Sequence, residues 1–247
     1  MRATLRHLRE HLPWRDSSGI GLLLLLLGLL AATLGFIALW DEVAERETQH
    51  FDEWALRALR EPGQPADALG PEWLSEAARD VTGLGSAAVL VLVVCAVAGF
   101  LALVRRWETL MLVVGSTVGG VLVNVLLKRV LDRPRPTVVP QLTWVATESF
   151  PSGHAMLSAT VYLTMAALLA QLTDRRWLKA YLLGVALTAT LLVGLTRVYL
   201  GVHYPTDVLG GWLAGVAWAL LSALVVRVVR RHSHRLEEEA EGRTTPP

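Results

Sequence analysis

The sequence predicts an all-α fold, a polytopic membrane helical bundle with six transmembrane helices and with both the N and C termini in the cytoplasm. Of the 247 residues, 53% are hydrophobic and 18% are charged. The charged residues are gathered between long apolar runs instead of being spread along the chain. Six of these runs are long enough for a helix to cross the hydrocarbon core of a bilayer, which takes about 20 residues.

The six predicted spans follow one another along the chain. They are residues 20–40, 84–104, 107–127, 152–172, 178–195 and 205–229. The first span has no clear cleavage site made of small residues before Trp40, so we interpret it as a retained membrane helix and not as a signal peptide. In the third span, Gly115, Gly119 and Gly120 predict close contacts with neighbouring helices.

The distribution of basic residues predicts the orientation of the bundle. Six spans place both chain ends on one side, and most of the arginines and lysines outside the spans fall on that side. They lie in residues 2–9, 105–106, 175–179 and 230–235. Because cytoplasmic loops are enriched in basic residues, this side is predicted to be cytoplasmic. The connections 41–83, 128–151 and 196–204 then face the periplasm or the outside.

Two terminal segments flank a predicted membrane domain of residues 19–230. Residues 1–18 carry leucines at helical spacing with arginines between them, which predicts a basic amphipathic segment on the membrane surface. An ordinary charged tail is the alternative for this segment. Residues 231–247, which are acidic and end in proline, are predicted to form a disordered cytoplasmic tail.

The extracytoplasmic loop 41–83 contains one predicted amphipathic helix. Its apolar residues repeat at helical spacing from Phe51 to Leu59, and the sequence Pro62-Gly63-Gln64-Pro65 ends the pattern. This helix, within residues 41–61, packs against the membrane domain, lies at the interface or covers a site. The sequence leaves open whether it gates that site.

Composition argues against two other classes of protein. The formal net charge of +1 gives no indication of a nucleic-acid partner. The single cysteine, Cys95, lies in an apolar run, so the chain has no intrachain disulfide and no zinc site made of thiolates.

Three polar clusters stand at the ends of spans, where they are predicted to face outward together. They comprise residues 128–136, 151–154 and 196–207. The first cluster places four cations on the side that should be poor in them: Lys128, Arg129, Arg133 and Arg135. Ionisable groups at this depth are costly unless they are paired or functional. The exception therefore predicts a bound anion.

The three clusters together supply the groups that bind a phosphoryl group during its transfer. Three cations can neutralise a phosphate dianion and the charge of its transition state: Lys128, Arg135 and Arg197. Ser152 and the backbone N–H groups of Gly153 and His154 lie at a helix N-terminus, which favours anions. These donors can bind the oxygens of the phosphoryl group.

Two histidines, His154 and His203, allow one nucleophile and one general acid. Asp207 follows His203 by four residues, and Pro205 begins a helix between them. A carboxylate on that first turn can reach back to one imidazole nitrogen, which leaves the other nitrogen free to attack.

The motifs Lys-x6-Arg-Pro (128–136), Pro-Ser-Gly-His (151–154) and Arg-x5-His-x3-Asp (197–207) resemble, in order, the three signature motifs of the type 2 phosphatidic acid phosphatase superfamily. That group includes integral-membrane lipid phosphatases and soluble vanadium haloperoxidases. The resemblance covers residues 107–229 by motif and the first two spans by topology only. The third motif usually opens with serine. Here Thr196 keeps the hydroxyl but adds a methyl group that could crowd the pocket.

The resemblance implies a role for each matched residue. His203 would attack phosphorus and form a phosphohistidine, Asp207 would orient His203, and His154 would protonate the leaving oxygen and then activate water. The phosphoryl group would be bound by Lys128, Arg135, Ser152, Gly153 and Arg197. Arg133 falls outside the motif spacing and is not assigned to the core site. The resemblance implies no metal and no other cofactor, because the cations take that role.

The implied function is that of a metal-independent membrane lipid phosphatase acting at the extracytoplasmic face of a bacterial-type inner membrane. Its substrate would be a lipid phosphate or pyrophosphate of the outer leaflet, such as undecaprenyl pyrophosphate, phosphatidylglycerophosphate or phosphatidic acid. The motifs bind phosphate and do not distinguish among these lipids. Two alternatives remain: a phosphotransferase that passes the phosphate to another lipid, and a non-catalytic phospholipid-binding or transport protein.

Overall fold

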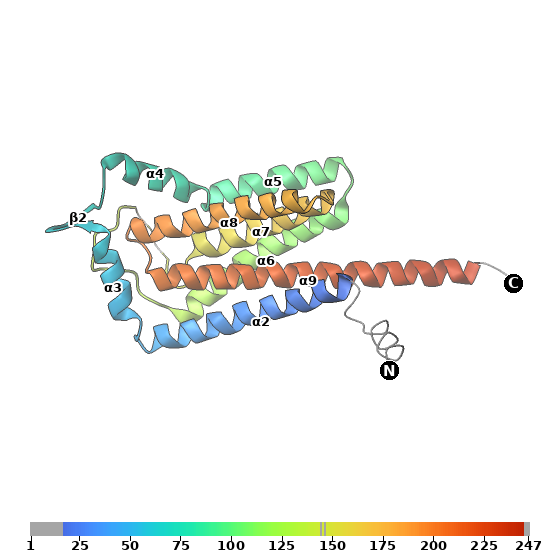
Figure 1. The fold of residues 1–247 in the computed structure, drawn as a ribbon, viewed down its shortest axis with the longest axis horizontal. Coiled ribbons are helices and arrows are strands. Elements are labelled where there is room, and N and C mark those ends of the chain that lie inside the picture. The colour runs from blue at the N-terminus through green and yellow to red at the C-terminus, as the bar shows by residue number, and fades with distance from the viewer. Residues whose placement is uncertain (1–16, 144, 146, 245–247) are drawn as a thin grey trace, which may run out of the picture.

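The computed structural model describes residues 17–143, 145 and 147–244, which form a bundle of long helices (Figure 1). The longest helices are α2 (Ser17–Ala44), α6 (Trp107–Leu131), α7 (Gly153–Leu169), α8 (Arg176–Tyr199) and α9 (Pro205–Thr244). The shorter elements are α3 (Gln49–Ala58), β1 (Arg60–Glu61), β2 (Gln64–Ala68), α4 (Glu72–Gly83), α5 (Ala87–Leu103) and the 3₁₀ helix η1 (Ala170–Leu172).

The predicted all-α membrane bundle is confirmed. Within the described residues, five helices are long and apolar enough to cross a membrane, and the number is six if α4 and α5 form one span bent by 43°. The predicted second span corresponds to α5, which begins at Ala87. Ser86 caps this helix, since its side chain accepts a hydrogen bond from the N–H of Val89 (3.3 Å).

The C-terminal helix is longer than the sequence predicted. α9 continues to Thr244, so residues 231–244, predicted to belong to a disordered tail, are helical. This segment is rich in arginine and glutamate, which favour helix, and the first proline comes only at Pro246. The predicted amphipathic segment 1–18 lies almost wholly outside the described residues.

The connection between α2 and α5 contains more structure than the one predicted helix. That helix is α3, and it is followed by an antiparallel hairpin of β1 and β2 whose turn contains Gly63 at φ +81°. The second amphipathic helix, α4, was not predicted. Its apolar residues recur at helical spacing, at Trp73, Leu74, Ala77, Ala78 and Val81, so the sequence did carry a signal for this helix.

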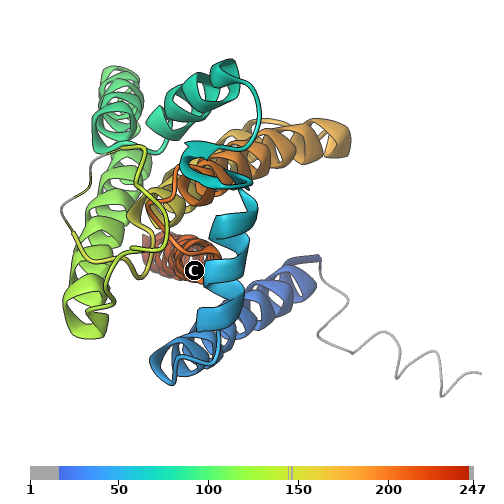
Figure 2. The ribbon, with the colours of Figure 1, turned by 90° about the vertical axis from the view of Figure 1, so that its left-hand side faces the viewer.

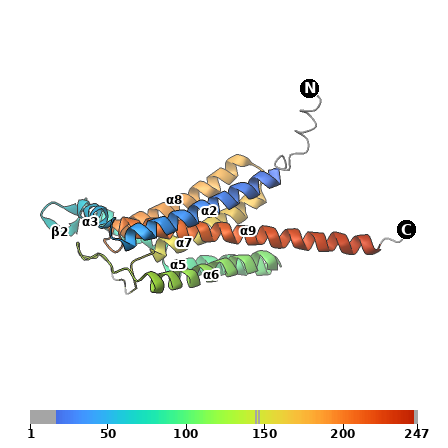
Figure 3. The ribbon, with the colours of Figure 1, turned by 90° about the horizontal axis from the view of Figure 1, so that it is seen from below.

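α7 lies at the centre of the bundle, where it packs against α6, α8 and α9, while α2 packs against α9 (Figure 3). The start of α2 and the end of α9 lie toward one end (Figure 1). The opposite end, here called the α3 end, carries α3, the hairpin, α4 and the connections 132–152 and 200–204. Every motif cluster found in the sequence therefore lies at the α3 end or in the helix turn next to it.

Glycines let α6 and α9 pack closely. A Cβ atom at Gly119 would lie 2.4 Å from the indole of Trp218, and one at Gly120 would lie 3.3 Å from it. The predicted close contacts are confirmed at these two positions. At Gly115 the prediction is wrong, because an added Cβ would meet nothing within 4 Å.

The contact between α7 and α9 gives a testable consequence. In Gly211→Ala, the new Cβ would lie 2.6 Å from the carbonyl oxygen of Ser152. We expect this overpacking to lower the free energy of unfolding by about 1–3 kcal/mol. Thermal denaturation of the purified protein in detergent measures the effect. Gly115→Ala is the matched control, and equal melting temperatures for the two variants would contradict the close packing.

Candidate active site

Four helix ends meet at the α3 end and bring the three motifs together. α6 and α8 end there and α7 and α9 begin there, because consecutive spans run in opposite directions. α8 ends in a Schellman turn, in which the N–H of Val202 donates to the carbonyl oxygen of Arg197 (3.2 Å). Gly201 has φ +72° in this turn, a conformation that glycine adopts without steric cost. The segment 202–204 is thereby held between α8 and Pro205, the first residue of α9.

His203 and Asp207 form a buried pair in this segment and in the first turn of α9. Nδ1 of His203 lies 3.4 Å from Oδ2 of Asp207. The same carboxylate oxygen accepts hydrogen bonds from the N–H of Tyr204 (2.8 Å) and from the hydroxyl of Ser149. A carboxylate at Nδ1 favours the tautomer with its proton on that nitrogen, which leaves a lone pair on Nε2. The arrangement therefore suits Nε2 for nucleophilic attack.

The surroundings of His203 keep its ring neutral. Burial lowers the pKa of His203 to about 4, although the hydrogen bond and the charge of Asp207 act in the opposite direction. The positive charges of Arg135 and Arg197 lower this pKa further. The imidazole consequently binds a proton only as the pH falls toward 4, so the unprotonated, nucleophilic form is present at neutral pH.

Three cations surround this histidine without a carboxylate partner. Lys128 donates to the hydroxyl of Thr147 (3.3 Å) and to the carbonyl oxygen of Glu148. Arg135 donates through Nε to the carbonyl oxygen of Thr147 (2.6 Å), and its Nη1 lies 3.3 Å from Nε2 of His203. In the part of the chain that the structure describes, neither residue forms a salt bridge with an aspartate or glutamate, and the same is true of Arg197.

Arg197 and Ser152 contribute polar atoms that are buried and unused. Arg197 is 2% exposed and Ser152 is 0% exposed. Nη1 of Arg197 donates to the hydroxyl of Thr82 in α4 (3.1 Å), whereas its Nε has no hydrogen-bond partner among the described residues. The hydroxyl of Ser152 also lacks a partner within these residues. Buried donors without acceptors are costly, so they indicate a place for an anionic ligand.

The first turn of α7 carries the remaining predicted residues. Ser152 is the N-cap, and the N–H groups of the first turn have no partners within the helix. Gly153 lies against Lys128, because a Cβ at Gly153 would be 3.7 Å from Cε of that lysine. His154 lies against Gly85, and electrostatic interactions couple its ring to His203 and the site cations. All eight predicted residues are thus brought together at the α3 end.

Thr196, where the resembled family usually has serine, uses its hydroxyl within its own helix. Its Oγ1 donates to the carbonyl oxygen of Val193 (2.7 Å). Threonine in a helix commonly forms this bond to the preceding turn. The hydroxyl of Thr196 is therefore occupied on α8 and is not one of the free donors of the site.

Several residues that hold the site together were not predicted from the sequence. Ser149 donates to Asp207, and Thr82 accepts from Arg197. Arg133 was left out of the core site, yet its Nη1 donates to Oδ1 of Asp207 (2.5 Å) and its guanidinium lies 4.4 Å from the ring centre of Tyr204. The position of Arg133 among the cations of residues 128–135 was a signal in the sequence. Ser149 and Thr82 had no such signal.

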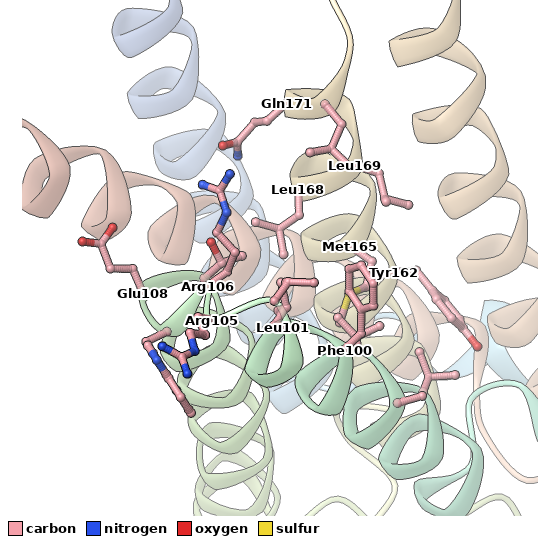
Figure 4. Close-up of a pocket in the computed structure, with 17 residues that line it drawn as sticks. Phe100, Leu101, Arg105, Arg106, Glu108, Tyr162, Met165, Leu168, Leu169 and Gln171 are labelled. Atoms are coloured by element: carbon pink, nitrogen blue, oxygen red, sulfur yellow. The ribbon is translucent and has the colours of Figure 1, made fainter.

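An apolar cavity in the described structure lies away from these residues. It has a volume of about 1450 Å³ and lies between α5, α7 and the start of α6, toward the end opposite the α3 end. Figure 4 shows apolar side chains of α5 and α7 along it, including Phe100, Leu101 and Met165, with Arg105 and Arg106 at one end. No residue of the three motifs lines this cavity. We therefore place the candidate active site at the buried polar groups of the motifs and not at this cavity.

Comparisons with known proteins agree with the motifs. The model of the PAP2 superfamily matches residues 109–231, which include all three motifs. Phosphatidylglycerophosphatase B of Bacillus subtilis is 39% identical over 189 residues, covering 74% of this chain and 87% of that protein. An undecaprenyl-diphosphatase of Sulfolobus acidocaldarius is 39% identical over 77 residues, covering 31% of this chain and 33% of that protein.

The fold also matches a solved structure. The crystal structure of the transmembrane PAP2 type phosphatidylglycerolphosphate phosphatase from Bacillus subtilis superposes with a TM-score of 0.72 at 29% sequence identity, covering 81% of this chain and 96% of the other. The resemblance noted in the sequence is confirmed by both kinds of comparison. With its motifs at one end of the same helical bundle, this chain belongs to the PAP2 superfamily.

Proposed function

We propose that this chain is a metal-independent lipid phosphatase that acts through a phosphohistidine on His203. The observation that carries the proposal is the buried pair of His203 and Asp207 beside three cations that have no carboxylate partner among the described residues. A phosphate dianion bound there would supply the negative charge that these cations lack. In return, the cations would supply the positive charge that a metal ion supplies in other phosphatases. The similarity to membrane lipid phosphatases supports this assignment.

In the first proposed step, the phosphoryl oxygens take the place of the carbonyl oxygens that now accept from Lys128 and Arg135. The lone pair of Nε2 of His203 attacks phosphorus while the bond from phosphorus to the lipid oxygen breaks. Protonated His154 gives its proton to that leaving oxygen. The first products are the dephosphorylated lipid and a phosphohistidine.

In the second proposed step, His154, which is now neutral, takes a proton from water as the water oxygen attacks phosphorus. The bond between phosphorus and Nε2 breaks, and its electron pair returns to the imidazole. Inorganic phosphate then leaves, and both histidines are back in their starting protonation states. Asp207 holds the ring of His203 in one orientation during both steps.

We propose further that the substrate is a phosphate or pyrophosphate of a membrane lipid in the outer leaflet of an inner membrane. Two substrate classes are suggested by the names of the relatives, phosphatidylglycerophosphate and undecaprenyl pyrophosphate. Phosphatidic acid is a third candidate with the same reactive group. The basic residues 105–106 and 175–179 lie on the connections away from the α3 end, which supports a cytoplasmic position for those connections and an external site.

The test is phosphate release by the purified full chain in detergent from phosphatidylglycerophosphate, phosphatidic acid and undecaprenyl pyrophosphate, with glycerol 3-phosphate as a control without a lipid tail. We expect at least one lipid to be hydrolysed at a rate that EDTA changes by less than about twofold, because the charge comes from side chains. A rate lost in EDTA and restored by magnesium would overturn metal independence.

Two other outcomes would each support one of the alternative functions. Transfer of labelled phosphate to a second lipid, with little free phosphate, would identify a phosphotransferase. No reaction with any of the lipids, by a protein that remains folded in detergent, would favour the non-catalytic phospholipid-binding or transport protein.

A further inference from the structure

Helix α3 lies across the α3 end of the bundle, over the start of α9 (Figure 2). It is outside the residues that match the family and outside the three motifs. Phe51 and Trp54 on this helix are more than half exposed, at 52% and 59%, whereas Asp52 is 0% exposed. A carboxylate that is completely buried must be paired with hydrogen-bond donors or a cation, since burial of an isolated charge is very costly.

Asp52 is fully paired. Apart from a hydrogen bond that the hydroxyl of Thr48, in the preceding turn, donates to its Oδ2 (3.3 Å), its partners come from the site. Its Oδ2 accepts hydrogen bonds from Nη2 of Arg133 (2.8 Å) and from the hydroxyl of Thr206 (2.6 Å). Its Oδ1 accepts from the N–H of Thr206 (3.2 Å). Thr206 is the residue directly before Asp207, so this one side chain of α3 binds the first turn of α9 and the connection after α6.

Arg133 joins Asp52 to Asp207. Its Nη2 binds Asp52, whereas its Nη1 donates to Oδ1 of Asp207 (2.5 Å) and to the hydroxyl of Thr206 (2.8 Å). Burial acts to lower the pKa of Arg133, but the charges of Asp207 and Asp52 outweigh it and the pKa is raised. Arg133 therefore stays charged and binds one carboxylate with each terminal nitrogen.

Because Arg133 binds a different aspartate with each terminal nitrogen, one oxygen of Asp207 remains for His203. Oδ1 is held by Arg133, and Oδ2 is directed to His203, Ser149 and the N–H of Tyr204. Arginine prefers to bind one carboxylate with two parallel hydrogen bonds. Without Asp52, Nη2 of Arg133 would be free to move toward Asp207, compete for Oδ2 and turn the carboxylate away from His203.

We propose that Asp52 is a positioning residue, which acts through Arg133 to hold Asp207 in the orientation that aligns His203 for attack. The inference rests on the proposed phosphohistidine function and extends the catalytic apparatus to α3. It assigns to Arg133, which the motif spacing excluded, the role of the link. Neither residue is expected to touch the phosphoryl group.

Asp52→Asn is the central test, because asparagine has the same size and keeps one acceptor oxygen for Thr206. We expect kcat for the best lipid substrate to fall about 10- to 100-fold, the range typical of residues that support a catalytic group. The KM and the inhibition constant of inorganic phosphate should change by less than about threefold, since the three cations of the site remain. Arg133→Gln should likewise lower kcat and leave KM nearly unchanged.

The double variant Asp52→Asn with Arg133→Gln tests whether the two residues act as one unit. If they do, the kcat of the double variant should be close to that of the less active single variant. The two fold-losses should not multiply. Multiplying losses would contradict the linked arrangement.

Leu56→Ala is the matched control for a purely structural role of α3. Leu56 lies one turn after Asp52, is 0% exposed and packs against Tyr204 and Val208. We expect a lower melting temperature from the lost packing but a kcat within about threefold of the wild type below the transition. Equal kcat losses in Leu56→Ala and Asp52→Asn would overturn the positioning role, as would an Asp52→Asn variant with wild-type kcat. An inactive wild type would instead refute the proposed function itself.

Discussion

Replacing His203 with alanine is expected to reduce phosphate release from the best lipid substrate by about 10⁴-fold or more, since removal of the proposed nucleophile leaves only binding and charge stabilisation. The ring is buried and held by Asp207. Burial keeps the pKa of His203 near 4, so in the wild type the neutral ring is available over the whole neutral range. The measurement is free phosphate released by purified wild type and variant at equal concentration.

The proposed phosphohistidine can be tested directly. With ³²P-labelled substrate and rapid quenching in base, label should remain on the wild-type chain and disappear on acid treatment, because phosphohistidine is stable in base and labile in acid. His203→Ala should carry no label. His50→Ala is the control, since His50 is exposed on α3 and contacts none of the site residues by hydrogen bond. A His203→Ala variant with more than a tenth of the wild-type rate would exclude His203 as the nucleophile.

Loss of Arg197 is the second large effect that we expect. Arg197→Ala should lower kcat/KM by about 10³-fold, the size found when a cation or donor that stabilises a phosphoryl transition state is removed. The reason is the position of the guanidinium, which is 2% exposed and has an Nε without a partner among the described residues. Arg197→Lys should recover part of the loss, because lysine keeps the charge but not the planar fork.

Two controls separate this role from the link that Arg197 makes to α4. Thr82→Val removes the hydroxyl that accepts from Nη1 of Arg197, and we expect less than a tenfold change in kcat/KM. Arg57→Ala removes an exposed arginine of α3 that pairs with Glu53, and we expect no change in activity. If Thr82→Val lost as much activity as Arg197→Ala, the arginine would be a structural connection and not a phosphate ligand.

Much of the site could be predicted because its residues stand at helix ends. The turn at Gly201 and the helix start at Pro205 are short-range features, and they fix how His203 and Asp207 approach each other. Antiparallel spans then bring the ends of α6, α7, α8 and α9 to one side. The motifs therefore needed little tertiary information to be placed together.

Contacts between distant segments were beyond the sequence. Asp52 lies 81 residues before Arg133 and 154 residues before Thr206. An aspartate on an amphipathic helix normally faces water, and no local pattern distinguishes one that is buried. The hydrogen bond between Thr82 of α4 and Arg197 is equally remote along the chain, since it joins residues 115 positions apart.

The sequence by itself determined the membrane-embedded helical class, the family and the set of chemical groups, because apolar run length and motif spacing are properties of the chain. Tertiary structure alone decided which residues support those groups. Docking of α3 over the start of α9 buried Asp52, and burial forced it to pair with Arg133 and Thr206. The free energy of burying a charge depends on what surrounds it after folding, and for this reason that part of the site appears only in three dimensions.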